Sequence, residues 1–289
     1  MKIGFIGLGN MGLPMAENLQ KAGYEVTGFD IKKNINTVIK ISNSFENFLI
    51  DNDVIFTMLP SGKEVSEVYN EIVAKSISSR IMIDCSTIDI KSTHSIAELA
   101  KKHRLQTLDA PVSGGVVGAI DGTLTFMVGG DQKAFEKVKP LFEIMGKKAV
   151  YCGKSGSGQA AKMCNNMILG ISMIGVCEAF TLAEKIGLDI EKLYEVSSNS
   201  SGSCWALNTY SPAPGIGPKT PADNNYEPGF SSDLMLKDLS LAQNAAEQTN
   251  SHTPLGLHAM QIYEELMKEG GQGKDFSYVL PLFSKKSRN

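Results

Sequence analysis

Several classes of protein are disfavoured by what this sequence has little of. Its 28 Lys and Arg against 31 Asp and Glu leave a formal net charge of −3, without the basic excess that nucleic-acid binding requires. Its five cysteines are scattered without a CxxC pair, which argues against a disulfide framework and fits a reducing compartment. Its four histidines lack ligand spacing, so we expect no metal.

Strand-forming residues begin at Lys2, so no signal or transit peptide is expected in the sequence as given. The predicted location is the cytoplasm, or the mitochondrial matrix if a eukaryotic presequence has been removed.

Long apolar runs are also scarce, with one exception between Gly156 and Gly187. Glycines at both ends predict a single helix there, about 45 Å long at about 1.5 Å per residue. A membrane span is disfavoured because Asn166, Ser172 and Glu178 interrupt the run. A helix apolar on all sides is otherwise buried by its own domain or by another copy of the chain. We expect the second, and therefore a homodimer or homotetramer without membrane or nucleic-acid partners.

The N-terminal segment predicts a dinucleotide-binding turn. A short β-rich run from Lys2 leads into a GxGxxG pattern and then a helical pattern. In such a turn Gly7 permits the tight bend, Gly9 lets the backbone approach a pyrophosphate, and Gly12 lets the helix pack against the strand. The predicted cofactor-binding residues of the turn are Gly7, Leu8, Gly9, Asn10, Met11 and Gly12.

The next predicted strand ends on Asp30, at the spacing where an acidic side chain accepts hydrogen bonds from the adenosine ribose. A carboxylate there also repels a 2′-phosphate. NAD is therefore the predicted cofactor, in preference to NADP.

Strand and helix patterns alternate as far as Cys152, after which only helices are predicted. This order indicates a Rossmann-type α/β fold, a doubly wound, mostly parallel sheet, followed by an all-α domain joined by the long helix. We assign residues 1–161 to an NAD-binding domain and residues 162–289 to an all-α substrate and oligomerisation domain. Lys162 and Asn166 are four apart and share a helix face, which makes them the candidate chemistry.

Eight segments resemble, in order, the 3-hydroxyisobutyrate dehydrogenases of the β-hydroxyacid dehydrogenase family. They are FIGLGNMGLPMA, TMLP, IDCSTID, DAPVSGG, GTLTFMVGG, GQAAKMCNNM, WALNTYSPAPG and LMLKDLSLA. The resemblance implies NAD-dependent oxidation of 3-hydroxyisobutyrate to methylmalonate semialdehyde in valine degradation. It also implies an all-α domain that intertwines with a second subunit.

Carried over by position, the resemblance makes Lys162 the catalytic residue and Asn166 its partner in orienting the substrate. The implied substrate-binding residues are Ser113, Gly114, Gly115, Trp205, Tyr210, Lys237 and Asp238. The implied cofactor contacts beyond the glycine turn and Asp30 are Leu59, Pro60, Glu64, Thr87 and Lys237. Lys162 would take the hydroxyl proton, without a metal.

Two other functions stay open. One is a sister activity of the family, on L-serine, tartronate, glyoxylate or succinate semialdehyde. The other is a non-catalytic NAD-binding protein, because a fold alone does not fix a function. Each residue also has a plain alternative, since a lysine early in a helix is usually solvated and a tryptophan is more often core.

Overall fold

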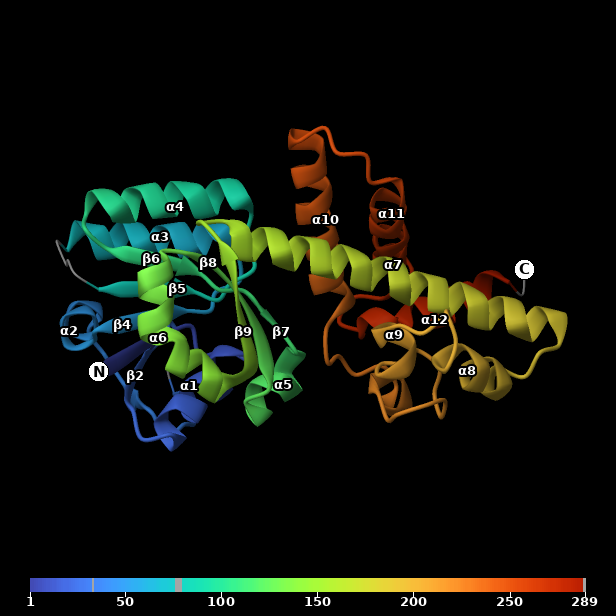
Figure 1. The fold of residues 1–289 in the computed structure, drawn as a ribbon. Coiled ribbons are helices and arrows are strands. Elements are labelled where there is room, and N and C mark those ends of the chain that lie inside the picture. The colour runs from blue at the N-terminus through green and yellow to red at the C-terminus, as the bar shows by residue number, and fades with distance from the viewer. Residues whose placement is uncertain (33, 76–79, 288–289) are drawn as a thin grey trace. The chain divides into compact units, whose positions relative to one another are not determined.

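The computed structural model describes residues 1–32, 34–75 and 80–287. The chain divides into two compact units, Met1–Lys162 and Met163–Asn289. The boundary falls within one continuous helix, α7 (Ser157–Ile186), which begins in the first unit and continues in the second (Figure 1).

In the first unit, strands and helices alternate as the sequence pattern predicts. The strands are β1 (Lys2–Ile6), β2 (Glu25–Phe29), β3 (Lys40–Ile41), β4 (Val54–Thr57), β5 (Ile81–Asp84), β6 (Gln106–Asp109), β7 (Val112–Ser113), β8 (Leu124–Gly130) and β9 (Gly146–Gly153). The helices are α1 (Gly12–Lys21), α2 (Phe45–Asp51), α3 (Gly62–Ala74), α4 (Ile90–Lys102), α5 (Gly115–Asp121) and α6 (Gln132–Met145).

The strands of the described residues form one sheet in the order β3-β2-β1-β4-β5-β6-β8-β7, with β9 beside β8. Every pairing from β3 to β6 is parallel, whereas β8 runs antiparallel to both β6 and β7. The predicted mostly parallel, doubly wound sheet is therefore confirmed. Because β1, β4, β5 and β6 are parallel neighbours, their carboxyl ends lie along one edge.

Each face of the sheet is covered by helices. Side chains such as Phe5, Phe56 and Phe142 form one core with α1 and α6, and Tyr69, Met82 and Ile96 form another with α3 and α4. Figure 1 shows α3 and α4 together on one face and α1 and α6 on the other. The sheet is apolar on both sides, as buried parallel strands require.

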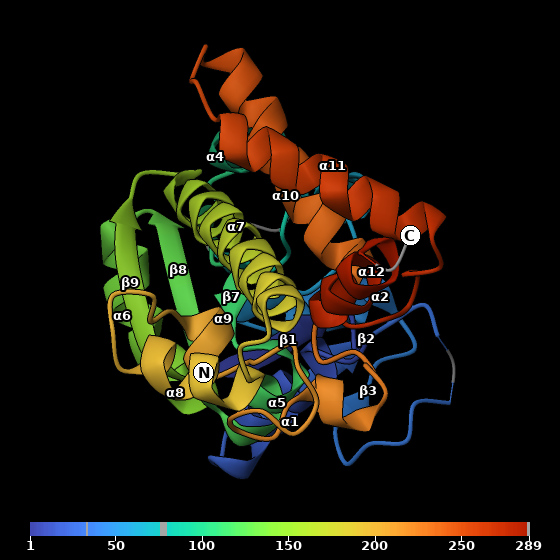
Figure 2. The same cartoon turned by 90° about the vertical axis from the view of Figure 1, so that its right-hand side faces the viewer.

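The second unit is helical. Its elements after α7 are α8 (Ile190–Ser198), α9 (Trp205–Asn208), η1 (Pro221–Asn224), α10 (Ser232–Gln248), α11 (Pro254–Lys268), η2 (Phe276–Tyr278) and α12 (Val279–Lys286). Helices α10 and α11 lie side by side, as both Figure 1 and Figure 2 show. They pack with α7 around buried residues such as Met173, Leu239 and Tyr263.

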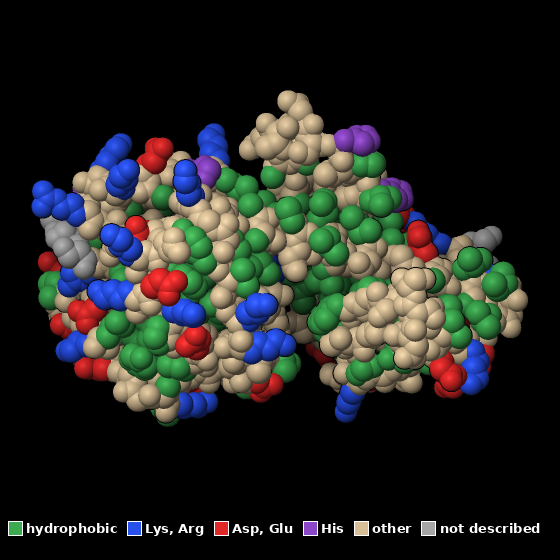
Figure 3. Space-filling model, viewed as in Figure 1, with side chains coloured by type: hydrophobic (Ala, Val, Ile, Leu, Met, Phe, Trp, Pro, Cys, Tyr) green, Lys and Arg blue, Asp and Glu red, His purple; other side chains and the backbone are tan. Residues whose placement is uncertain are grey.

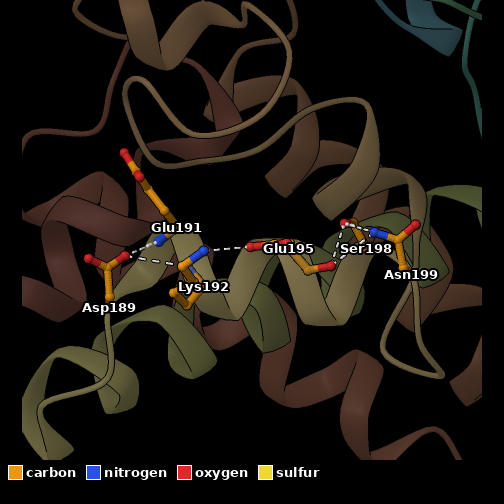
Figure 4. Close-up of polar contacts among 6 residues, drawn as sticks. All are labelled: Asp189, Glu191, Lys192, Glu195, Ser198 and Asn199. Atoms are coloured by element: carbon orange, nitrogen blue, oxygen red, sulfur yellow. Dashed lines mark hydrogen bonds and ion pairs between the residues drawn. The ribbon is translucent and has the colours of Figure 1, made fainter.

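Polar contacts fix where α8 begins and ends (Figure 4). The Asp189 carboxylate accepts hydrogen bonds from the backbone N–H groups of Glu191 (2.7 Å) and Lys192 (3.3 Å), so it caps the first turn. Lys192 pairs with Glu195 at 2.8 Å along the exposed face, and the Asn199 amide donates to the Glu195 carbonyl at 2.9 Å. The predicted helical segment thus ends at a side chain that closes its last turn.

By length and composition alone, helix α7 could cross a membrane. Half of its most apolar stretch is buried inside the protein, and the core helix of a globular domain can have the same length and composition. It ends where Leu188 N–H donates to the Ala183 carbonyl at 2.8 Å beyond Gly187, which has a φ of +81°. This glycine stop agrees with the predicted end.

Gly158 allows α7 to start directly against the sheet. A Cβ at this position would lie 2.3 Å from the Met127 carbonyl oxygen and 2.6 Å from that of Asp109. Backbone atoms of β6 and β8 cannot move aside as a flexible side chain would. The helix therefore meets the strand ends backbone to backbone.

We expect Gly158→Ala to lower the free energy of unfolding by about 3 kcal/mol, because the added methyl group overpacks the contact. This sign is opposite to that of an ordinary helical Gly→Ala change, which stabilises by up to about 1 kcal/mol. Gly9→Ala is the control, since a Cβ at Gly9 meets no atom within 4 Å. Urea unfolding of both variants without cofactor measures the effect, and equal stabilities would contradict it.

Candidate active site

The glycine turn between β1 and α1 has the shape that a dinucleotide requires. Gly7 has a φ of +90°, and a Cβ at Gly12 would lie 1.9 Å from the Gly7 carbonyl oxygen. The space over Gly9 is open, and α1 begins without a side-chain cap at Met11. Open space before uncapped backbone N–H groups suits the negative charge of a pyrophosphate. The exposed Asn10 lies in the same turn.

Asp30 follows β2 and forms a hydrogen bond to the backbone of the glycine turn. Its Oδ2 accepts a hydrogen bond from the Leu8 N–H at 2.6 Å, and its Oδ1 accepts one from the Lys32 N–H at 2.7 Å. Each carboxylate oxygen has a second lone pair, so the same group can also accept from a ribose hydroxyl. Asp30 therefore ties the end of β2 to the turn after β1.

The segments after β4 and β5 are joined to each other. The Leu59 N–H donates to the Ser86 hydroxyl at 2.9 Å, next to the exposed Pro60 and the half-buried Thr87. Glu64 lies in the first turn of α3, where its carboxylate accepts a hydrogen bond from the Ser61 hydroxyl at 2.5 Å. That hydrogen bond lowers the pKa of Glu64. In the structure Glu64 thus helps to start α3.

The turn at Ser113–Gly115 begins the short helix α5. Gly114 has a φ of +135° and Gly115 a φ of +63°, values that L-residues rarely adopt. Ser113 is half-buried at the end of β7 and pairs with Thr125 of β8. The two glycines thus allow a sharp backbone turn at the end of a strand.

Lys162 lies on α7 at the end of the first unit, and its side chain is only 6% exposed. Ammonium groups are rarely buried to this degree unless other groups interact with them. The burial argues against a merely solvated lysine.

In the second unit, Asn166 of α7 and Asp238 of α10 are brought together. The Asn166 amide nitrogen donates to Asp238 Oδ2 at 2.5 Å, and both side chains are at least nine-tenths buried. The Asn166 amide oxygen accepts a hydrogen bond from Asn165 at 3.0 Å. Lys237, next to Asp238, is half-buried. The predicted pair of Lys237 and Asp238 is therefore more than a solvated helix pair.

Trp205 and Tyr210 also lie together, with stacked rings whose centroids are 4.9 Å apart. The Tyr210 hydroxyl donates to Asp275 Oδ2 at 2.9 Å, and burial raises the pKa of Tyr210. Asp275 is fully buried, and the same oxygen accepts hydrogen bonds from the Gly229 and Phe230 N–H groups. One carboxylate therefore closes both ends of the loop between Tyr210 and Gly229.

Sequence reasoning missed Asp275, Asp109 and Gln159. Asp275 precedes Phe-Ser, and its Oδ1 accepts from the Ser277 N–H at 3.0 Å, so a helix-capping pattern was available in the sequence. Asp109 lies near the end of a strand predicted from Gln106 to Pro111, which placed it near the carboxyl edge of the sheet. Gln159 has no such signal, because nothing in the sequence shows which backbone groups an amide in a helix will reach.

Asp84, at the end of β5, is a buried carboxyl group that is only half satisfied. Its Oδ1 accepts hydrogen bonds from the Thr57 hydroxyl at 2.8 Å and the Ser86 N–H at 3.1 Å. Its Oδ2 is buried and accepts none from the described residues. Burial raises the pKa of Asp84 from 3.8 to about 6, with the hydrogen bonds from Ser86 and Thr57 opposing the rise. Asp84, Thr93 and Asp109 are among the residues that line a small cavity.

Two family models match the chain. Residues 2–153 match the NAD binding domain of 6-phosphogluconate dehydrogenase, and residues 156–283 match the NAD-binding domain of NADP-dependent 3-hydroxyisobutyrate dehydrogenase. Together with the fold and the glycine turn, they define an oxidoreductase whose cofactor is a nicotinamide dinucleotide.

Curated relatives resemble the chain over nearly its whole length. The mitochondrial 3-hydroxyisobutyrate dehydrogenase of Drosophila melanogaster is 45% identical, with 98% of this chain and 89% of that protein aligned. An NAD-dependent L-serine dehydrogenase of Pseudomonas aeruginosa is 43% identical over 98% of this chain and 97% of that protein. The solved Mycobacterium tuberculosis 3-hydroxyisobutyrate dehydrogenase with L-serine has a TM-score of 0.92 at 42% identity, covering 97% and 98% of the two chains. The chain belongs to the 3-hydroxyisobutyrate dehydrogenase family.

The raised pKa of Asp84 predicts a pH-dependent stability. The native state binds this proton more tightly than the unfolded state, so the charged carboxylate penalises only the folded protein as pH rises from about 4 to about 7. A pKa difference of about 2 corresponds to about 3 kcal/mol.

The amide of Asp84→Asn cannot ionise. We therefore expect the difference in unfolding free energy between this variant and wild type to rise by about 3 kcal/mol over that pH range and then stay level. Urea unfolding at a series of pH values measures this difference. The exposed Asp51→Asn is the control and should show no comparable trend. A gap between Asp84→Asn and wild type that is constant with pH would show that folding leaves the pKa of Asp84 unchanged.

Proposed function

We propose that the protein oxidises 3-hydroxyisobutyrate to methylmalonate semialdehyde with NAD, as a step of valine degradation. The observation that carries the proposal is the 45% identity, over almost the full chain, to a relative that bears this name. The buried Lys162 and the joined Asn166 and Asp238 support it, because the family resemblance assigns the chemistry to these positions.

The first unit supplies the cofactor site in this proposal. Gly9, Asn10 and Met11 face the pyrophosphate, Asp30 accepts from the ribose, and Leu59, Pro60 and Thr87 line the remainder. Gly7, Leu8 and Gly12 shape the turn itself. Glu64 and Lys237 complete the proposed cofactor contacts. When bound there, NAD would supply the acceptor for the hydride that leaves the substrate carbon.

The chain's own residues orient the substrate and move its proton. The backbone of Ser113, Gly114 and Gly115 holds the substrate carboxylate. Lys162 acts as a neutral amine and takes the hydroxyl proton as the carbonyl forms, becoming an ammonium group. Asn166 donates a hydrogen bond without a change in charge. The remaining substrate contacts come from Trp205, Tyr210, Lys237 and Asp238. We accordingly divide the chain into an NAD-binding domain, residues 1–161, and a substrate and oligomerisation domain, residues 162–289.

L-serine dehydrogenation is the second candidate, favoured by the 43% identical relative named for that activity and by the solved relative with L-serine. L-serine differs from 3-hydroxyisobutyrate in carrying an amino group where the latter carries a methyl group. Both are 3-hydroxy acids, so the same carboxylate and proton-transfer groups serve either substrate. Turnover with each acid separates the two candidates.

We further propose that a second copy of the chain covers α7. Several residues that share one exposed stripe of this helix are apolar, among them Ile168, Gly175, Leu182 and Ile186. Ile168, Leu182 and Ile186 are 63%, 60% and 70% exposed. Figure 3 shows hydrophobic side chains gathered along the helix in the second unit. A homodimer or homotetramer would remove this surface from water.

All five cysteines are free thiols, which suits the cytoplasm or the mitochondrial matrix as the working compartment.

The activity and the role of Lys162 are tested together. Absorbance of the reduced cofactor, followed with NAD and NADP and a panel of 3-hydroxy acids, should show the highest kcat/KM for 3-hydroxyisobutyrate with NAD. Lys162→Ala and Lys162→Arg should each lose about 10²–10⁴-fold in kcat, because a guanidinium group keeps its proton at working pH.

NAD affinity, measured by calorimetry, should stay near that of wild type in both variants, which separates proton transfer from folding. Near-normal turnover of Lys162→Arg would mean that only the positive charge matters. Absence of turnover with every acid on the panel would sink the proposed function itself.

A charge on the exposed stripe of α7 tests the oligomer. Leu182→Lys should shift sedimentation velocity towards a smaller species, because an unpaired charge at an apolar interface is costly. Leu255→Lys is the matched control, since Leu255 is 66% exposed on another helix, α11. A wild-type protein that sediments as an active monomer would refute the oligomer.

A further inference from the structure

The N-terminus of α7 is held by a buried carboxylate from the sheet. Asp109 Oδ1 accepts a hydrogen bond from the Gly156 N–H at 2.8 Å, and its Oδ2 accepts one from the Gln159 N–H at 3.1 Å. The first N–H groups of a helix have no partner within the helix, so Asp109 serves as a cap supplied by β6. Together with the close approach at Gly158, this leaves the first turn little freedom to shift.

Gln159 extends the connection to the segment after β5. It is fully buried, its amide nitrogen donates to the Ser86 carbonyl at 2.7 Å, and its amide oxygen accepts from the Ile88 N–H at 3.2 Å. The two backbone groups fix the orientation of the amide, since one can only accept and the other can only donate. One side chain therefore forms hydrogen bonds to the backbone on both sides of Thr87.

These hydrogen bonds also connect Gln159 to a second segment of the proposed cofactor site, the turn after β4. The Ser86 hydroxyl accepts the Leu59 N–H, so the Gln159 amide and the turn after β4 meet at one residue. On the helix side, Lys162 follows Gln159 by three residues, less than one turn. Because this first turn is rigid, fixing the position of Gln159 also fixes the position of the Lys162 backbone.

Resting on the proposed function, we propose that Gln159 is a positioning residue for the reaction. Its hydrogen bonds hold the backbone of α7, which bears Lys162, at a fixed distance from the segment around Thr87. In the proposed function that segment contacts the cofactor. Gln159 itself touches neither reactant. A displacement of about 1 Å between reacting groups can cost about 10²-fold in rate, so such a link affects turnover more than binding of the hydroxy acid.

The test uses Gln159→Met, which keeps the length of the side chain and removes both hydrogen bonds, and Gln159→Glu, which keeps only the acceptor. We expect kcat to fall about 10- to 100-fold in both, with KM for the hydroxy acid changed less than about threefold. The Kd for NAD should rise several-fold. Hydrogen exchange at the Ile88 amide should accelerate in Gln159→Met without cofactor, because only this variant lacks the acceptor for that amide.

Asn52→Leu is the matched control. Asn52 is 1% exposed and its amide donates to the Phe48 carbonyl at 2.6 Å, but it precedes β4 at the opposite edge of the sheet. Its replacement should lower Tm while leaving kcat and the Kd for NAD unchanged. A comparable loss of kcat in this control would attribute the effect of Gln159 to general destabilisation.

A Gln159→Met enzyme with faster Ile88 exchange but kcat within about twofold of wild type would overturn the inference. If wild type turns over none of the acids, the proposed function fails on its own account, and the Kd for NAD then decides the role of Gln159. An unchanged Kd in Gln159→Met would refute this role. A several-fold rise would show that Gln159 helps to hold the segment around Thr87 in place for the cofactor.

Discussion

The close contact between the start of α7 and the ends of β5, β6 and β8 is the constraint on which much of the first unit depends. Asp109 supplies the missing partners of the helix N-terminus, and Gly158 leaves no room for a side chain between helix and sheet. Burying the Asp109 carboxylate raises its pKa, so the arrangement has an electrostatic cost that the backbone hydrogen bonds from Gly156 and Gln159 partly offset.

Much of the fold could be predicted because local patterns determine it. The glycine turn, the parallel strands and the extent of α7 each follow from spacing, since tight backbone approaches need glycine and buried strands need apolar runs. The two-residue strands β3 and β7 were not predicted, and β8 was predicted as a strand without its antiparallel direction. Two-residue strands have no pattern, and strand direction depends on pairing with distant residues.

The residues of the candidate site also include some that the sequence predicts and some that it does not. Asp30 was assigned from its position after a predicted strand, Lys162 from the helix face that it shares with Asn166, and Ser113 from the family resemblance. The structure places Asn166 against Asp238 from distant parts of the chain. The supporting carboxylates and amide, Asp84, Asp109 and Gln159, could not be found from the sequence. Their roles come from hydrogen bonds to backbone groups, and backbone groups are the same at every residue.

The unit boundary falls inside α7 instead of in a linker, and this has a consequence for how such a chain can evolve. Recombination at Lys162 would leave one half with less than two turns of the helix and deprive the other half of its capped beginning. The two halves therefore cannot be exchanged as interchangeable modules in the way that domains joined by flexible linkers can. Inheritance of the whole chain as one piece is the expected outcome.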